Sequence, residues 1–220
     1  MTADLTHIDT WLFDLDNTLY PEESGFMGSV EGRMTDFVAK VSGLPRDQAY
    51  ALQKKYLAEH GLTLKGLMLN HGVDPADFHA LFHDLSLEVL AQDPKLLIAL
   101  AKLPGRRFIF TNADDKHAER VMAHLGLADL FDDVFHIHSF GFAPKPDPLG
   151  FHRMIEGHGM DPMATAFFED SERNLKPAAD LGMTTVLVGP RASASNADFV
   201  HHRTAKLTPF LSEARLKEAA

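Results

Sequence analysis

The chain has 220 residues and no cysteine, and its 31 Asp and Glu residues outnumber 21 Lys and Arg residues, giving a formal net charge of −10. The lack of cysteine excludes disulfides, thiolate nucleophiles and cysteine metal ligands. The acidic balance, without any Lys/Arg run, argues against a nucleic-acid polymer as partner. No apolar run approaches the roughly 18 residues of a membrane span and the first residues lack a signal-peptide pattern, so we expect a cytoplasmic protein.

The first predicted strand is the apolar run from Ile8 to Phe13, and two carboxylates, Asp14 and Asp16, follow it at once. The carboxyl ends of parallel strands face the ligand crevice of an α/β sheet, so acids at this point indicate an active site. Asp, Asn and Thr also form ordinary solvated turns, and this segment alone does not decide between the two interpretations.

About ninety residues separate this run from the next apolar run, too many for a simple crossover between two strands. From Met27 to Val41 apolar residues recur at spacings of three and four, which predicts a helix, and similar patterns follow. We therefore expect a small helical cap at residues 19–94, inserted into an α/β core of residues 1–18 and 95–220. Its Met and aromatic residues are assigned to packing rather than to substrate contacts.

The rest of the chain alternates short apolar runs with helical patterns, as in a doubly wound α/β fold. The runs are Phe108–Phe110, Val134–His138, Ala166–Phe168 and Thr185–Val188. The helical patterns cover residues 95–103, 116–125, 149–157, 173–181 and 207–217. We predict a parallel, Rossmann-like sheet with helices on both faces.

Polar groups stand at or shortly after the ends of these runs: Thr111 with Asn112, Lys145 between two prolines, and Glu169 with Asp170. Each signal is weak by itself, because strand-end polar residues are common. Their order and setting reinforce one another, since all would meet at one edge of a parallel sheet.

These side chains suit the chemistry of phosphate monoesters, which needs an in-line nucleophile, a proton for the leaving oxygen and positive charge for the phosphoryl oxygens. Asp14 is suited to be a nucleophile that forms an aspartyl phosphate, and Asp16, two residues on, to be the general acid and base. Mg²⁺ prefers carboxylate oxygens, so we expect a metal site formed by Asp14, Asp16, Asp170 and, through water, Glu169.

The substrate phosphate would be bound by the Thr111 hydroxyl, the Asn112 backbone amide and the Lys145 ammonium group. In the predicted cap, Lys65 is a candidate for reading the rest of the substrate. The plainer interpretation of Lys65 is a surface lysine.

At these residues the chain resembles the haloacid dehalogenase-like hydrolases, whose four ordered motifs are matched by residues 14–18, 111–112, 145–146 and 169–170. The resemblance implies that Asp14 is the nucleophile and Asp16 the acid and base. It also implies a Mg²⁺ cofactor and a helical cap inserted after the first strand.

Longer segments, residues 13–21, 109–114 with His117, and 167–174, are similar to the pyrimidine 5'-nucleotidase branch of that superfamily. This resemblance implies a small phosphorylated substrate, a pyrimidine nucleoside 5'-monophosphate. One position departs from the branch, because Glu169 stands where an aspartate is usual.

Three alternatives stay open. A sugar-phosphate phosphatase or a phosphomutase resembling β-phosphoglucomutase would use the same four motifs, and the mutases also carry a Glu-Asp pair. A noncatalytic binding protein could keep the fold, although every expected side chain is present. A dehalogenase of the same fold lacks the second carboxylate, so Asp16 argues against it.

His136 and His138 lie two residues apart and would share one face of an extended strand. We assign them a structural or solvent-facing role, because no acidic or histidine partner lies at a recognisable ligand spacing.

Overall fold

In the computed structural model, which describes residues 2–217, the apolar runs form one parallel sheet in the order β4-β3-β2-β5-β6-β7. Its strands are β2 (Thr10–Phe13), β3 (Arg106–Phe110), β4 (Asp133–Phe135), β5 (Thr165–Glu169), β6 (Thr184–Val188) and β7 (His202–Thr204). In the centre, Leu12 of β2 is in register with Phe108 of β3 and with Phe167 of β5. The predicted doubly wound parallel sheet is confirmed.

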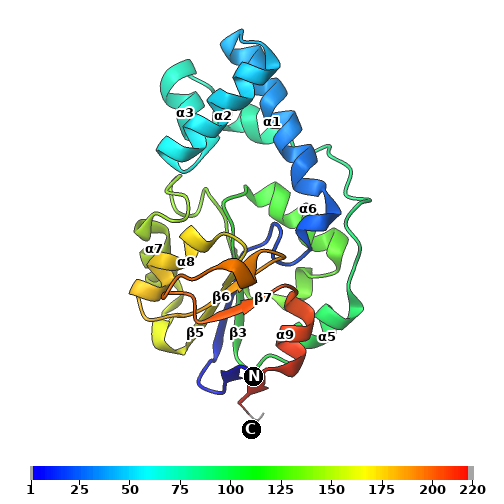
Figure 1. Ribbon diagram of the computed structural model, residues 1–220, viewed down its shortest axis with the longest axis vertical. Helices are drawn as coiled ribbons and strands as arrows, with labels where there is room; N and C mark the ends of the chain where they lie inside the picture. The colour runs from blue at the N-terminus through cyan, green and yellow to red at the C-terminus, as the bar shows by residue number, and fades with distance from the viewer. Residues whose placement is uncertain (1, 218–220) are drawn as a thin grey trace. The chain divides into compact units, whose positions relative to one another are not determined.

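Helices cover both faces of the sheet, with α7 and α8 on one face and α5, α6 and α9 on the other (Figure 1). They are α5 (Pro94–Ala101), α6 (Asp115–Leu125), α7 (Pro148–His158), α8 (Glu172–Asp180) and α9 (Leu207–Glu213). Short 3-10 turns are η1 (Glu22–Ser24), η2 (Ala128–Leu130), η3 (Pro162–Ala164) and η4 (Ala192–Ala194), and a separate parallel pair joins β1 (Asp4–Leu5) to β8 (Arg215–Leu216).

The central strands are buried on both sides, which is why they read as continuous apolar runs. Their aromatic side chains stack across the sheet, with the rings of Phe13 and Phe168 4.6 Å apart. Aspartate side chains begin the helices that follow: Asp114 accepts from the His117 backbone amide at 2.7 Å and Asp147 from that of Leu149 at 2.9 Å. Rigid strands and capped helices thus hold the loops between them.

The chain divides into two units, one with the described residues of 1–24 and 90–220 and the other with residues 25–89. Residues 19–24 and 90–94, which the sequence places with the cap, belong to the first unit. The reason is burial and capping: Leu19 and Tyr20 are buried, and Asp93 accepts hydrogen bonds from the first amides of α5.

Residues 25–89 form a helical unit of α1 (Phe26–Ser42), α2 (Arg46–His60), α3 (Thr63–His71) and α4 (Pro75–Ala80). A buried hydrogen bond of 2.7 Å from Thr35 to Gln53 joins α1 to α2. Gly66 lets α3 approach α2, since a Cβ there would lie 2.3 Å from the Tyr56 ring. The aromatic residues pack on each other, as in the 5.3 Å ring contact of Phe78 with Phe82.

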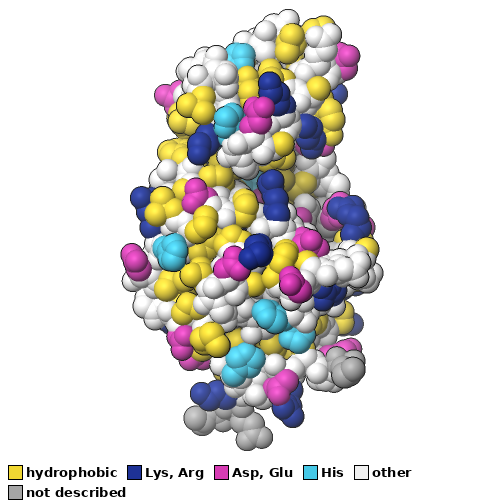
Figure 2. All heavy atoms as spheres, turned by 60° about the vertical axis from the view of Figure 1, so that its left-hand side comes forward, with side chains coloured by type: hydrophobic (Ala, Val, Ile, Leu, Met, Phe, Trp, Pro, Cys, Tyr) yellow, Lys and Arg dark blue, Asp and Glu magenta, His cyan; other side chains and the backbone are white. Residues whose placement is uncertain are grey.

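Charged side chains of both signs are interspersed on the face drawn in Figure 2, and that face has no broad basic patch. Among residues 2–217, no helix is both long enough and apolar enough to cross a lipid bilayer.

Candidate active site

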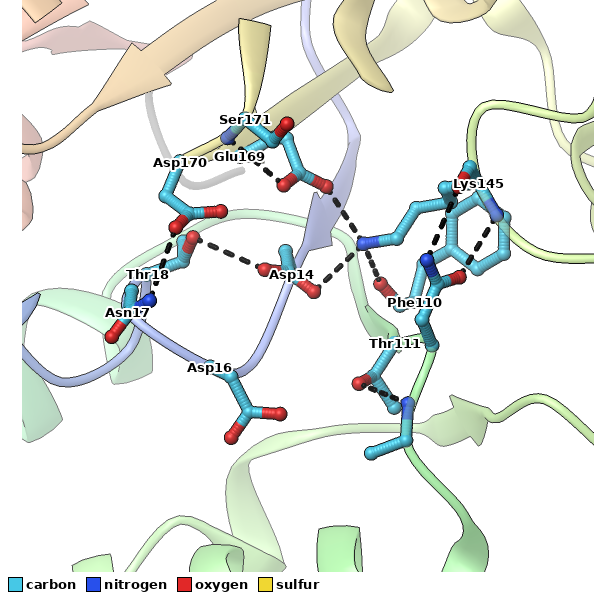
Figure 3. A network of polar contacts seen from close by, with 12 residues as sticks. Asp14, Asp16, Asn17, Thr18, Phe110, Thr111, Lys145, Glu169, Asp170 and Ser171 are labelled. Carbon is cyan, nitrogen blue, oxygen red and sulfur yellow. Dashed lines mark hydrogen bonds and ion pairs between the residues drawn. The ribbon is translucent and has the colours of Figure 1, made fainter. Parts of the chain in front are cut away.

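Asp14 stands at the carboxyl end of β2, the central strand between β3 and β5. Its backbone amide donates to the Phe168 carbonyl at 2.9 Å, so the position is fixed by the sheet itself. The side chain is buried and points toward Lys145, which approaches from the loop after β4 (Figure 3). Two of the predicted motifs therefore meet at one carboxylate.

Lys145 is buried and uses all three of its ammonium protons. The Nζ atom donates to Asp14 Oδ1, Glu169 Oε2 and the Phe110 carbonyl, each at 2.7 Å. Burial lowers the pKa of Lys145, but the charges of Asp14 and Glu169 outweigh it and hold the pKa above its ordinary value. The lysine is thus a permanent cation between two buried carboxylates.

The Asn112 side chain holds the backbone of Lys145 through two hydrogen bonds, a role that the sequence did not reveal. Its Oδ1 accepts from the Lys145 backbone amide at 2.8 Å, and its Nδ2 donates to the Lys145 carbonyl at 3.2 Å. Thr111, at the end of β3, accepts from the Ala113 amide at 3.1 Å and keeps its own hydroxyl proton as a donor. The predicted contact of the Asn112 backbone amide with phosphate stays a prediction.

We expect Asn112→Ala to lower the free energy of unfolding by about 1–3 kcal/mol, because it leaves the part-buried amide and carbonyl of Lys145 without these partners. Urea unfolding would measure the loss. Asn196→Ala, at an exposed asparagine after η4, is the matched control and should keep the wild-type unfolding midpoint. Identical unfolding midpoints for wild type and Asn112→Ala would show that these two hydrogen bonds contribute nothing.

Three carboxylates form an acidic cluster at this edge: Asp14, Glu169 and Asp170, with one oxygen from each within 4.8 Å of the others. Burial, with the charge of Glu169 nearby, raises the pKa of Asp14 to about 7, and burial likewise raises that of Glu169 to about 7. The pKa of Asp170 is raised by burial and by the charge of Asp14. Such a set of hard oxygen ligands fits Mg²⁺, whose charge would stabilise the ionised carboxylates.

Both oxygens of Glu169 already have partners, Oε2 with Lys145 and Oε1 with the Ser171 amide at 3.1 Å. Asp170 accepts from the Asn17 side chain at 3.3 Å, and Asn17 adopts the left-handed conformation with φ 62° that turns the chain after Asp16. Direct metal contacts therefore suit Asp14 and Asp170 better than Glu169.

The carboxylate of Asp16 points away from this cluster (Figure 3). Its Oδ1 accepts from the Tyr20 hydroxyl at 2.6 Å and lies 2.9 Å from Nε2 of the buried His117. Although burial opposes it, His117 and Tyr20 lower the pKa of Asp16, and Asp16 in turn raises the pKa of His117 against the effect of burial. Of the four acids predicted to surround the metal, this structure gathers three.

The sequence motifs assign no role to the two residues that contact Asp16. Tyr20 lies four positions after Asp16, but His117 lies 101 positions away and enters only as part of a resemblance. Lys65, the substrate-reading candidate, is an exposed residue of α3 in the helical unit, and its role stays a prediction.

The buried pair of Asp14 and Lys145 at the carboxyl edge of a doubly wound sheet is the arrangement that the resemblance to haloacid dehalogenase-like hydrolases implies. The family model described as haloacid dehalogenase-like hydrolase matches residues 8–182, so the chain belongs to this family. The predicted superfamily is thereby confirmed.

Two curated relatives are similar in sequence. Phosphate metabolism protein 8 of Saccharomyces cerevisiae is 32% identical over 193 residues, covering 80% of this chain and 60% of the yeast protein. GMP/IMP nucleotidase YrfG of Escherichia coli is 29% identical over 117 residues, 52% of each chain. The chain thus spans between about half and three fifths of the length of these relatives.

Among solved structures, a phosphatase of the same superfamily from Thermococcus onnurineus superposes with a TM-score of 0.65. It is 22% identical, and the match covers 94% of this chain and 100% of that one. At this identity the likeness supports the fold alone.

Proposed function

We propose that this protein is a Mg²⁺-dependent phosphatase that hydrolyses small phosphate monoesters through an aspartyl phosphate on Asp14. The observation that carries the proposal is the pairing of two carboxylates in different surroundings. Asp14 lies against Lys145 in the acidic cluster, whereas Asp16 is held apart by Tyr20 and His117. Two acids kept in separate environments can take the separate roles of nucleophile and proton donor.

In the first step, a carboxylate oxygen of Asp14 forms a bond to phosphorus while the bond to the leaving oxygen breaks, and that oxygen takes a proton from Asp16. Because the pKa of Asp16 is lowered and that of His117 is raised, this proton is the one that the Asp16–His117 pair holds, passed from the imidazole through the Asp16 carboxylate. In the second, Asp16 takes a proton from water as the water oxygen attacks the aspartyl phosphate, which releases phosphate and restores Asp14. Thr111 and Lys145 would neutralise the phosphoryl oxygens. Asp14 and Asp170 would hold Mg²⁺ directly and Glu169 through water, and the ion would add positive charge beside the same phosphoryl oxygens.

We further propose pyrimidine nucleoside 5'-monophosphates as the substrates. Support for a pyrimidine base comes from the likeness of residues 13–21, 109–114 with His117, and 167–174 to that nucleotidase branch. The relative named as a GMP/IMP nucleotidase is named for purine nucleotides, so it supports a nucleoside monophosphate as substrate but not the pyrimidine base. Glu169 favours a second candidate, a sugar-phosphate phosphatase or mutase, because a Glu-Asp pair also occurs in such mutases.

Phosphate release from a panel of nucleotides, sugar phosphates and an aryl phosphate, with and without Mg²⁺, tests these proposals. Mg²⁺-dependent release with preference for UMP or CMP supports the nucleotidase. Preference for sugar phosphates moves the assignment to the second candidate. No release by folded protein from any substrate, in the presence of Mg²⁺, contradicts the phosphatase.

Weakening the support of Asp16 should matter most for poor leaving groups. We expect His117→Ala and Tyr20→Phe to reduce kcat/KM, which reports the steps up to formation of the aspartyl phosphate, by up to about 100-fold for an alkyl phosphate such as a nucleotide, since each removes one contact that orients the proton donor. The same variants should lose much less activity toward a dinitrophenyl phosphate, because its leaving oxygen needs no proton.

The two substrates are compared on the same preparations, so a general loss of folded protein cancels. Equal losses for both substrates would show that these residues support the fold or phosphate binding rather than the proton donor. His124→Ala, at a histidine on the same helix whose Nε2 lies near the Leu90 carbonyl, serves as the control.

A further inference from the structure

A second group of potential ligands lies outside the acidic cluster, at the first residue of α6 and in the turn after β4. It consists of Asp115, His136 and His138, with one ligand atom from each within 4.8 Å of the others. We propose that these three residues form a site for a divalent cation of the zinc class. This proposal does not depend on the phosphatase assignment.

No acidic residue lies near the two histidines at a recognisable ligand spacing in the sequence, but the fold brings Asp115 beside them. Strand β4 ends at Phe135, earlier than predicted, and His136 and His138 lie in the turn that follows. Between them, the buried Ile137 donates its amide to the Ala113 carbonyl at 3.0 Å. This bond brings Asp115, two residues beyond Ala113, beside both imidazole rings.

The distances suit a small ion. Ligands of a tetrahedral zinc ion, bound at about 2.1 Å, lie about 3.4 Å from each other. His138 Nδ1 and Asp115 Oδ1 are already 3.6 Å apart. The ring centroids of His136 and His138 are 5.6 Å apart with nearly perpendicular planes, so both rings can present a nitrogen to one point.

The protonation states of His136 and Asp115 also suit a bound divalent cation. Half-burial of its ring lowers the pKa of His136, which favours the neutral imidazole that binds metals. The pKa of Asp115 is lowered too, because the Lys116 amide and the two histidines outweigh the effect of burial. In addition, His136 Nδ1 is buried and has no hydrogen-bond partner within residues 2–217.

Ligand chemistry selects the kind of cation. Two imidazole nitrogens and one carboxylate favour Zn²⁺, Co²⁺ or Ni²⁺, whereas Mg²⁺ favours the all-oxygen cluster of Asp14 and Asp170. Side-chain exposures of 49% for Asp115 and 38% for His138 leave room for water to complete the coordination. The alternative is a surface ion pair between Asp115 and His138, which needs no third residue and contributes little to stability.

Calorimetric titration of Zn²⁺ into the intact protein, with millimolar Mg²⁺ present to occupy the acidic cluster, tests the proposal. We expect one zinc site that weakens by more than about tenfold in His138→Ala and in Asp115→Asn. His152→Ala, which removes an exposed histidine of α7, should bind like wild type. The visible spectrum of bound Co²⁺ should lose intensity in the same two variants.

Thermal unfolding gives an independent measurement. Zinc at 100 times its Kd should raise the Tm of wild type by roughly 5–10 °C and that of His138→Ala far less. Because His138 and Asp115 are partly exposed, their variants are expected to fold. Zinc affinity that is equal in wild type, His138→Ala and Asp115→Asn would overturn the proposal, as would the absence of any zinc binding by wild type.

Discussion

Asp14→Asn is expected to reduce turnover by roughly 10⁴-fold or more, because an amide cannot replace the carboxylate that attacks phosphorus. The fold should persist. Asparagine has nearly the same shape, and its Oδ1 can still accept the hydrogen bond from Lys145. Burial and the charge of Glu169 already disfavour ionised Asp14, whose pKa is raised to about 7, so loss of this charge should leave the Tm at pH 8 unchanged or higher.

Steady-state phosphate release in the presence of Mg²⁺ and thermal unfolding measure the two effects. Asp129→Asn, at an exposed acid of η2, controls for the change from acid to amide and should retain wild-type turnover. If Asp14→Asn keeps more than a few per cent of wild-type activity, with its intact mass confirmed, another group is the nucleophile.

The sheet could be predicted because its central strands are buried on both faces and therefore read as apolar runs. Strand β7, three half-buried residues at His202–Thr204, lacks that signal, as do the two-residue strands β1 and β8. The helical unit also begins at Gly25 rather than at the predicted residue 19. Leu19 and Tyr20 are buried, and the periodicity of the apolar residues does not show to which unit they belong.

The site could be predicted to the level of which strand ends meet, but not to the level of which atoms touch. Parallel strands bring Asp14, Thr111 and Glu169 to one edge wherever the sheet is recognised. The contact of His117 with Asp16 depends instead on the direction of a side chain in the first turn of α6, 101 residues further on. In the same way, a backbone hydrogen bond between two loops decides that Asp115 lies beside His138.

Lys145→Met should destabilise the metal-free protein by about 3–5 kcal/mol at pH 8, because it leaves two buried carboxylates without their shared cation. Turnover should also fall, since the charge that would neutralise the phosphate is lost. Methionine fills a similar volume, so the packing against Phe110 and Phe167 is largely kept. Urea unfolding with a chelator present measures the stability.

The pH dependence separates charge from packing. Asp14 and Glu169 have folded-state pKa values raised to about 7, above those of the unfolded chain, so their ionisation costs stability as pH rises from about 4 to 7. Without Lys145 these pKa values should rise further. The difference in unfolding free energy between Lys145→Met and wild type should therefore be smaller at pH 5.5 than at pH 8.

A double-mutant cycle with Glu169→Gln completes the test. If Lys145 acts by balancing charge, Glu169→Gln should cost less in the Lys145→Met background than in wild type, with a coupling of about 0.5–3 kcal/mol. Zero coupling and a loss independent of pH would mean that Lys145 stabilises the fold through packing alone. The assignment of Glu169 as the anchor of the lysine would then fail, and the longer glutamate would have to be explained by the metal site instead.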